Sequence, residues 1–164
     1  MNALIFNGKV VQIEAATFPV HSALTWVAIP SGTDVVPGWS YSGGTFTAPP
    51  APPAPTLAQQ AATLIAGGLT ITSTSKPALN GAYACDDARQ ARINRIQGFI
   101  AANSKFPNSL TALPWPDISG VVHEFPSTAE FTAFASAVAD YVMALDAVIM
   151  GISTTLPPAK ATIP

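Results

Sequence analysis

The chain has 164 residues, of which 49% are apolar and only 10% are charged, and its formal net charge is −2. Soluble proteins are usually about 25% charged. We therefore expect part of this surface to be covered by other proteins. The slight acidic excess excludes a general electrostatic attraction to nucleic acid or anionic membranes. The single cysteine, Cys85, excludes an intrachain disulfide and a cysteine-based zinc site, and we expect a partly buried structural thiol.

Residues 1–47 are predicted to form a small antiparallel β module. Asn7-Gly8 separates two apolar, β-branched runs. It is a strong hairpin signal, because both central residues of a type I′ turn need positive φ. A further strand is expected at 24–29. The sequence GWSYSGGTFT predicts a second hairpin with Trp39 and Tyr41 on one face. Such a small module buries little apolar surface alone.

Residues 48–55, APPAPPAP, are predicted to form a linker in polyproline II conformation. At a rise of about 3.1 Å per residue, such a linker spans roughly 25 Å. The alternative is a PxxP ligand for an SH3-like groove. Those ligands usually carry a nearby basic residue, and none lies between Lys9 and Lys76. We interpret the segment as a semi-rigid spacer.

Residues 56–151 are predicted to form a mainly α-helical module with a few short strands. Helices are expected at 56–66, after the cap Thr56, at about 83–104, and from Ser127 to Gly151. Ser127 and Glu130 form a capping-box pattern. Strands are expected at 69–74 and 118–125, with a proline-broken loop between 104 and 118. The fold class is therefore α+β.

The long C-terminal helix is predicted to be buried. Its core stripe runs from Phe131 to Ile149, and Ala133, Ala137 and Ala144 form a second, smooth face. Asp140 and Asp146 would each cost about 2.5–3.5 kcal/mol near the centre of a membrane span, so we expect no membrane insertion. The alanine face is an interface candidate, because other copies of the chain would cover it in a homo-oligomer. Residues 152–164 are predicted to be an extended tail that needs another surface to be ordered.

Three of the seven basic residues, Arg89, Arg92 and Arg95, lie in one predicted helix. They could bind a phosphate or carboxylate bidentately, or they could form a solvated face with Asp86 pairing Arg89. Arg89 projects into the apolar stripe of its helix, so we favour a structural or interface role and take Arg89 as an interface candidate.

No pattern predicts a catalytic, cofactor or metal site, and we expect no enzyme activity. His21 and His123 have no metal-ligand spacing, and the S-x-x-K match at Ser73 lacks companion motifs. Phosphate-binding glycine motifs are absent. Trp39, Tyr41 and Phe46 could stack a sugar or a base, but we favour sheet core or a protein interface. No basic residue lies between positions 10 and 75, which disfavours nucleic acid.

The stretch FPVHSALTWVAIPSGTDVVPGWSYSGGTFTAPPAPP resembles small tailed-bacteriophage proteins in which a GW-x-Y-x-GG-x-F segment precedes a proline-rich linker. Similar stretches occur in phage tail and tail-fibre assembly proteins. The later segments YACDDARQARINRIQGFIAAN and FPSTAEFTAFASAVADYV resemble an uncharacterised phage tail-associated domain. The two parts cover most of the chain, and the resemblance implies no catalytic residues.

The resemblance implies a structural protein of the bacteriophage tail, made in the bacterial host cytoplasm and located in the virion. It would join the tail tip or baseplate to a fibre or a neighbouring subunit, and its partners would be other tail or fibre proteins and copies of itself. One alternative is a tail-fibre assembly chaperone that leaves the finished particle. A second is a glycan-binding module that uses Trp39, Tyr41 and Phe46.

Overall fold

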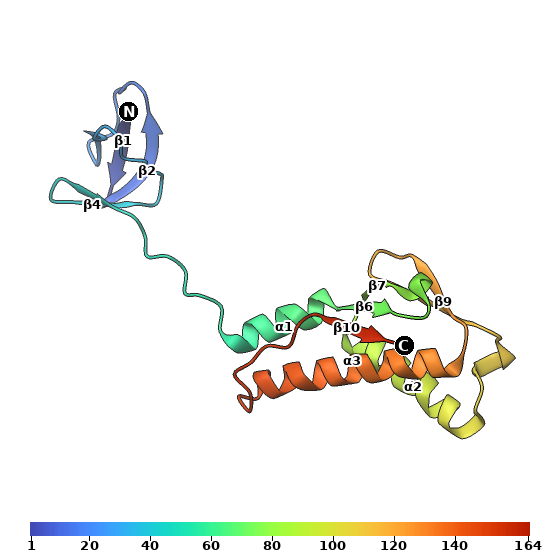
Figure 1. Cartoon of the computed structure of the whole chain (residues 1–164). Coiled ribbons are helices and arrows are strands. Elements are labelled where there is room, and N and C mark those ends of the chain that lie inside the picture. Colours follow the sequence, from blue (N-terminus) through green and yellow to red (C-terminus); the bar gives the residue numbers. More distant parts are fainter. The chain divides into compact units, whose positions relative to one another are not determined.

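The computed structural model describes residues 1–164, and the chain divides into two compact units, Met1–Ala54 and Pro55–Pro164. An antiparallel sheet makes up the first unit, and three helices pack with short, mostly antiparallel strands in the second, so the fold is α+β, as predicted. Figure 1 shows the units and the segment that links them in the sequence. Residues 48–56 of this segment have no regular secondary structure, and all of them are exposed.

The first unit is a five-stranded antiparallel sheet with the strand order β3-β1-β2-β4-β5. Its strands are β1 (Asn2–Phe6), β2 (Lys9–Glu14), β3 (Leu24–Ala28), β4 (Ser40–Ser42) and β5 (Thr45–Thr47). Asn7 and Gly8 join β1 to β2 with φ values of 49° and 71°. Gly43 and Gly44 join β4 to β5 with φ values of 58° and 85°. Both predicted hairpins are confirmed.

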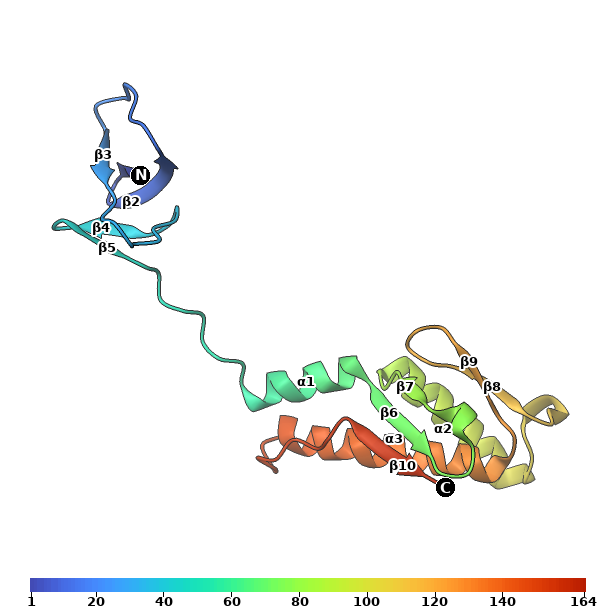
Figure 2. The same cartoon turned by 45° about the horizontal axis from the view of Figure 1, so that its top comes forward.

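The second unit packs three helices against a small mixed sheet. The helices are α1 (Leu57–Gly67), α2 (Asp87–Asn103) and α3 (Thr128–Ile149). The sheet has the order β10-β6-β7 and contains β6 (Leu69–Ser73), β7 (Gly81–Tyr83) and β10 (Lys160–Ile163). A separate hairpin pairs β8 (Leu113–Pro116) with β9 (Val122–Phe125), and short 3₁₀ turns lie at Pro77–Leu79 and Pro107–Ser109. Figures 1 and 2 show α1 and β10 running alongside α3.

Aromatic rings form the centre of the second unit's core. The rings of Phe125 and Phe134 lie 5.0 Å apart, and those of Phe125 and Phe131 lie 5.3 Å apart. Trp115 and Tyr83 border this cluster, and both side chains are at most 1% exposed. Offset and edge-on aromatic pairs each add about 0.5–1.5 kcal/mol beyond burial. The cluster therefore ties α3 to β7, β8 and β9.

Side-chain caps begin all three helices. Thr56 and Gln59 form a complete capping box on α1, and Asp86 accepts a hydrogen bond from the N–H of Arg89 at the start of α2. Ser127 caps α3 as predicted, accepting from the N–H of Glu130 at 3.4 Å. The reciprocal hydrogen bond of the predicted capping box, from the N–H of Ser127 to the Glu130 carboxylate, is not formed. One carboxylate oxygen of Glu130 is instead buried without a hydrogen-bond partner.

The predicted loop between 104 and 118 was wrong in part, because it contains β8. Proline has no backbone N–H, but Pro114 and Pro116 alternate with Leu113 and Trp115, which have one. Because every second residue of an antiparallel edge strand donates to its partner strand, β8 can still pair with β9. The strand expected at 118–125 is only β9. Residues 117–121 instead form a turn, in which the N–H of Val121 donates to Asp117 Oδ1 at 2.8 Å.

The C-terminal tail is part of the second unit, where β10 pairs in parallel with β6. Thr162 lies opposite Thr72, and Ile163 lies opposite Ser73. Ile163 is 3% exposed, and Ser73 Oγ donates to the carbonyl of Pro164 at 2.7 Å. The predicted tail needs another surface to be ordered, and that surface is β6 of the same chain, about ninety positions earlier in the sequence.

The long helix α3 is the one helix that is long and apolar enough to cross a membrane by length and composition. A core helix of a soluble protein passes the same test, and eight side chains of α3 are buried within the second unit. Phe131, Phe134 and Leu145 are among these eight, as predicted. Ile149 was placed in the core wrongly: it is 42% exposed, and Val148 is buried instead.

Candidate interaction surfaces

The three aromatic candidates of the first unit lie together but are only half exposed. Trp39, Tyr41 and Phe46 pack against a buried cluster that includes Val10 and Val35, and the rings of Tyr41 and Phe46 are 4.8 Å apart. A sugar platform needs the flat face of an aromatic ring open to solvent. The structure places these rings on the small core instead, which counts against the glycan-binding alternative.

A different apolar surface of the first unit is open to solvent. Phe6 and Val11 are 41% and 45% exposed, and together with Leu24 they border a shallow hollow of about 310 Å³. Phe6 lies opposite Leu24 in the pairing of β1 with β3. The sequence signal for this surface is the run of three apolar residues from Leu4 to Phe6. Successive side chains of a strand point to opposite faces, so such a run places apolar side chains on both faces of the sheet.

The alanine face of α3 is covered by the chain's own tail. Ala137 and Ala144 border a hollow whose other wall is formed by Pro157, Pro158 and β10. Ala133 and Ala137 pack against the core. A segment of the same chain therefore lies beside Ala137 and Ala144, and contact of this face with other copies stays a prediction. The small alanine side chains let an extended segment of the same chain approach α3 closely.

The three arginines of α2 form no ion pair. No lysine or arginine forms an ion pair, so the Asp86–Arg89 pair of the solvated-face alternative is absent. Arg89 is half-buried, whereas Arg92 and Arg95 are exposed. Arg92 and Arg95 border a hollow of about 390 Å³ with Ile96, Leu113 and the segment 107–110. This hollow therefore has an apolar floor and two cationic side chains at its rim.

Arg92 has a structural contact that Arg95 lacks. Its guanidinium carbon lies 4.5 Å from the centre of the Trp115 ring, within the range of a cation–π interaction. This contact holds Arg92 in place at the rim of the hollow. Arg92 forms no ion pair, so its guanidinium N–H groups remain available for an anion.

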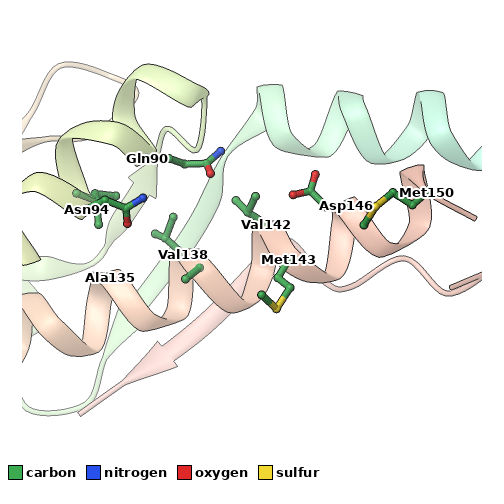
Figure 3. A pocket seen from close by; sticks show the side chains of 10 residues that line it. Gln90, Asn94, Ala135, Val138, Val142, Met143, Asp146 and Met150 are labelled. Atoms are coloured by element: carbon green, nitrogen blue, oxygen red, sulfur yellow. The ribbon is translucent and has the colours of Figure 1, made fainter. Parts of the chain in front are cut away.

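A second hollow, of about 320 Å³, lies between α2 and α3. Figure 3 shows Gln90 and Asn94 on the α2 side, and Val138, Val142 and Asp146 on the α3 side. Met143 and Met150 also border it and are 74% and 65% exposed. Large apolar side chains this exposed on one helix mark a contact surface when they cluster. Met143 lies on α3 and Met150 is the C-cap of that helix, seven positions later, a spacing that is visible in the sequence.

His123 links three segments of the second unit. Its Nδ1 lies 2.6 Å from the carbonyl of Ala78, and its Nε2 lies 3.4 Å from Asp117 Oδ2. Partial desolvation opposes ionisation of Asp117. Hydrogen bonds from the N–H groups of Val121 and Ser119 and from His123 outweigh it and hold the pKa of Asp117 below its usual range. The contacts of His123 are those of a structural histidine that fixes the β8–β9 hairpin.

Cys85 is a buried structural thiol, as predicted. Desolvation is the main cause that raises its pKa to about 11, and the charge of Asp86 adds to this, against a hydrogen bond from the N–H of Leu69. Such a thiol is a poor nucleophile at neutral pH. No group of three His, Cys, Asp or Glu side chains that could hold a metal ion is found in the structure.

Comparisons of the chain with protein-family models, with curated proteins and with solved structures found no match.

Proposed function

We propose that the protein is a structural connector of a bacteriophage tail, retained in the virion in several copies and acting through protein–protein contacts. The observation that carries the proposal is the division into two compact units joined in sequence by an exposed, proline-rich segment. Each unit has its own core and its own exposed apolar surface. A chain built this way has one surface for each of two partners.

The placement in a phage tail rests on the resemblance of residues 18–53 and of the two later segments to tail-associated proteins. The low charge of the chain supports it, because 10% charged residues leave large uncharged areas suited to permanent contacts. In this arrangement the first unit binds one tail protein through the surface around Phe6 and Val11. The second unit binds another subunit at the tail tip, the baseplate or the fibre attachment.

Mass spectrometry of virions purified from the phage that encodes this chain tests the proposal. We expect peptides from both units at an abundance comparable to that of known tail proteins. A chain that is abundant in the infected-cell lysate but absent from purified virions would instead support the tail-fibre assembly chaperone.

A matched pair of phage mutants tests the role of the linker. Deleting residues 49–54 shortens the reach between the units, whereas replacing them with six Gly or Ser residues keeps the contour length but removes the stiffness. A connector tolerates the replacement better than the deletion, measured as infectious particles per tail. Equal infectivity of the deletion and the wild type would contradict a spacer role.

A further inference from the structure

An exposed methionine on α3 is flanked by two carboxylates. Asp140, Met143 and Asp146 follow one another at three-residue intervals, so they are neighbours on the helix surface. Met143 is 74% exposed, and both aspartates are exposed and form no ion pair. The helix has no lysine or arginine, and Lys160, which borders the tail hollow together with Asp140, forms no ion pair with it. We call these three residues the acidic knob.

The hollow beside α2 has the complementary chemistry. Its apolar floor includes Ile96 and Leu113, and Arg92 and Arg95, three residues apart on α2, stand at its rim. An enclosed cavity of about 150 Å³ holds a benzene ring, so an open hollow of about 390 Å³ has room for one methionine side chain. Neither arginine has a carboxylate partner. We call this surface the basic hollow.

The knob and the hollow face different sides of the second unit. Gln90 and Asn94 form the side of α2 that faces α3. Arg92 contacts Trp115 of β8, and with Arg95 it borders the hollow that includes segment 107–110. The knob of one chain is therefore unable to reach its own hollow. A second copy of the chain supplies the missing partner for each surface.

We propose that the second units associate head to tail, with the acidic knob of one copy inserted in the basic hollow of the next. Met143 fills the apolar floor, which suits a flexible, polarisable side chain. Asp140 and Asp146 accept hydrogen bonds from the guanidinium N–H groups of Arg92 and Arg95. Because the two surfaces differ, the contact is heterologous and builds rings or filaments rather than a two-fold dimer. This inference deepens the proposed function by naming the self-contact of a multi-copy connector.

Sedimentation velocity of the full chain over a concentration series tests the contact. We expect concentration-dependent association of the wild type. Met143→Ala removes the exposed side chain that fills the apolar floor and should weaken association at least about tenfold. Arg95→Glu should have the same effect, because it places a carboxylate opposite the aspartates. Lys76→Glu, which makes the same charge change outside both surfaces, should associate like the wild type.

A charge-swapped pair distinguishes this contact from every other mode of association. The doubly substituted chains Arg92→Glu/Arg95→Glu and Asp140→Arg/Asp146→Arg should each be monomeric. Mixed in equal amounts they should associate, since each reversed surface then meets a complementary one. Recovery in the mixture also shows that both variants are folded. Salt should weaken the wild-type complex.

Two results would overturn the inference: a wild type that stays monomeric at every concentration, or arginine variants that associate like the wild type. Neither result bears on whether the chain is present in virions. Conversely, absence of the chain from virions would remove the tail role and leave a measured head-to-tail contact in place.

Discussion

The guanidinium of Arg92 lies 4.5 Å from the centre of the buried indole ring of Trp115. Trp115 is 1% exposed, and its ring lies 5.7 Å from that of Phe131. This one contact joins the exposed surface of α2 to the aromatic core beneath α3. Arg92 thus covers the outer face of the core while standing at the rim of the basic hollow.

Replacing Arg92 with Ala should lower the free energy of unfolding by about 0.5–1 kcal/mol, the value of a cation–π contact at an exposed site. Urea denaturation followed by tryptophan fluorescence measures the change. Arg95→Ala is the matched control, because Arg95 has no aromatic partner. Its effect should stay within about 0.5 kcal/mol. Equal losses in the two variants would show that the ring contact contributes nothing.

Gly68 is required where α1 turns into β6. Its φ is 78°, and a Cβ at this position would lie 2.4 Å from the carbonyl oxygen of Tyr83, a backbone atom that is unable to move aside alone. Gly68→Ala should therefore cost about 2–4 kcal/mol of unfolding free energy. The preceding residue is the control, since a Cβ at Gly67 meets nothing within 4 Å.

Gly67→Ala should be neutral or should stabilise the protein by about 0.4–1 kcal/mol, because alanine restricts the unfolded chain. Chemical denaturation of both variants gives the comparison. A Gly68→Ala protein as stable as Gly67→Ala would contradict the close approach of Gly68 to the backbone carbonyl of Tyr83.

The C-terminal strand should contribute to the stability of the second unit. Ile163 is 3% exposed, so Ile163→Ala should cost about 2–4 kcal/mol through lost burial and the cavity left behind. Ile152, in the same tail, is 75% exposed. Ile152→Ala should change stability by less than about 0.5 kcal/mol. Equal, small effects of both substitutions in urea denaturation would mean that β10 is not held on β6 in solution.

Asp117 should make the second unit sensitive to acid. Its pKa is lowered from 3.8 in the folded state, so its ionisation stabilises the fold above that pH. The stabilisation is lost as the pH falls below 3.8 and through the lower folded pKa. Urea denaturation between about pH 2 and pH 6 follows this loss. In Asp117→Asn the free energy of unfolding should fall less steeply with decreasing pH than in the wild type. Glu124→Gln, at an exposed neighbour, should keep the steepness of the wild type. An unchanged pH dependence in Asp117→Asn would contradict the role of its hydrogen bonds.

Local signals in the sequence predicted the elements that depend on neighbouring residues. The turn at Asn7-Gly8, the caps Thr56 and Ser127, and the helices α1 and α3 all follow from chemistry within a few positions. Strand β10 depends on pairing with β6, about ninety residues earlier, and no local pattern marks it. Strand β8 was missed because Pro114 and Pro116 are typical of loops, although an edge strand accepts proline at alternate positions.

The exposure of the candidate interaction residues also depends on contacts between distant segments of the chain. The small side chains on α3 predict a close neighbour, and beside Ala137 and Ala144 the structure has the chain's own tail, which no local pattern marks. Trp39 and Tyr41 are partly buried and pack against the small core of the first unit, whose fully buried residues are all aliphatic. Met143 is exposed because α2 and the tail pack on other parts of the surface of α3. The sequence does not indicate where these two segments pack.

A cryo-electron map of the purified virion tests the tail connector role most directly. We expect density for both units in the tail, with the first unit on one tail protein, the second unit on another, and neighbouring second units in contact through Met143 and Arg95. A tail whose density is fully accounted for by other proteins, or in which both units bind the same subunit, would contradict a connector.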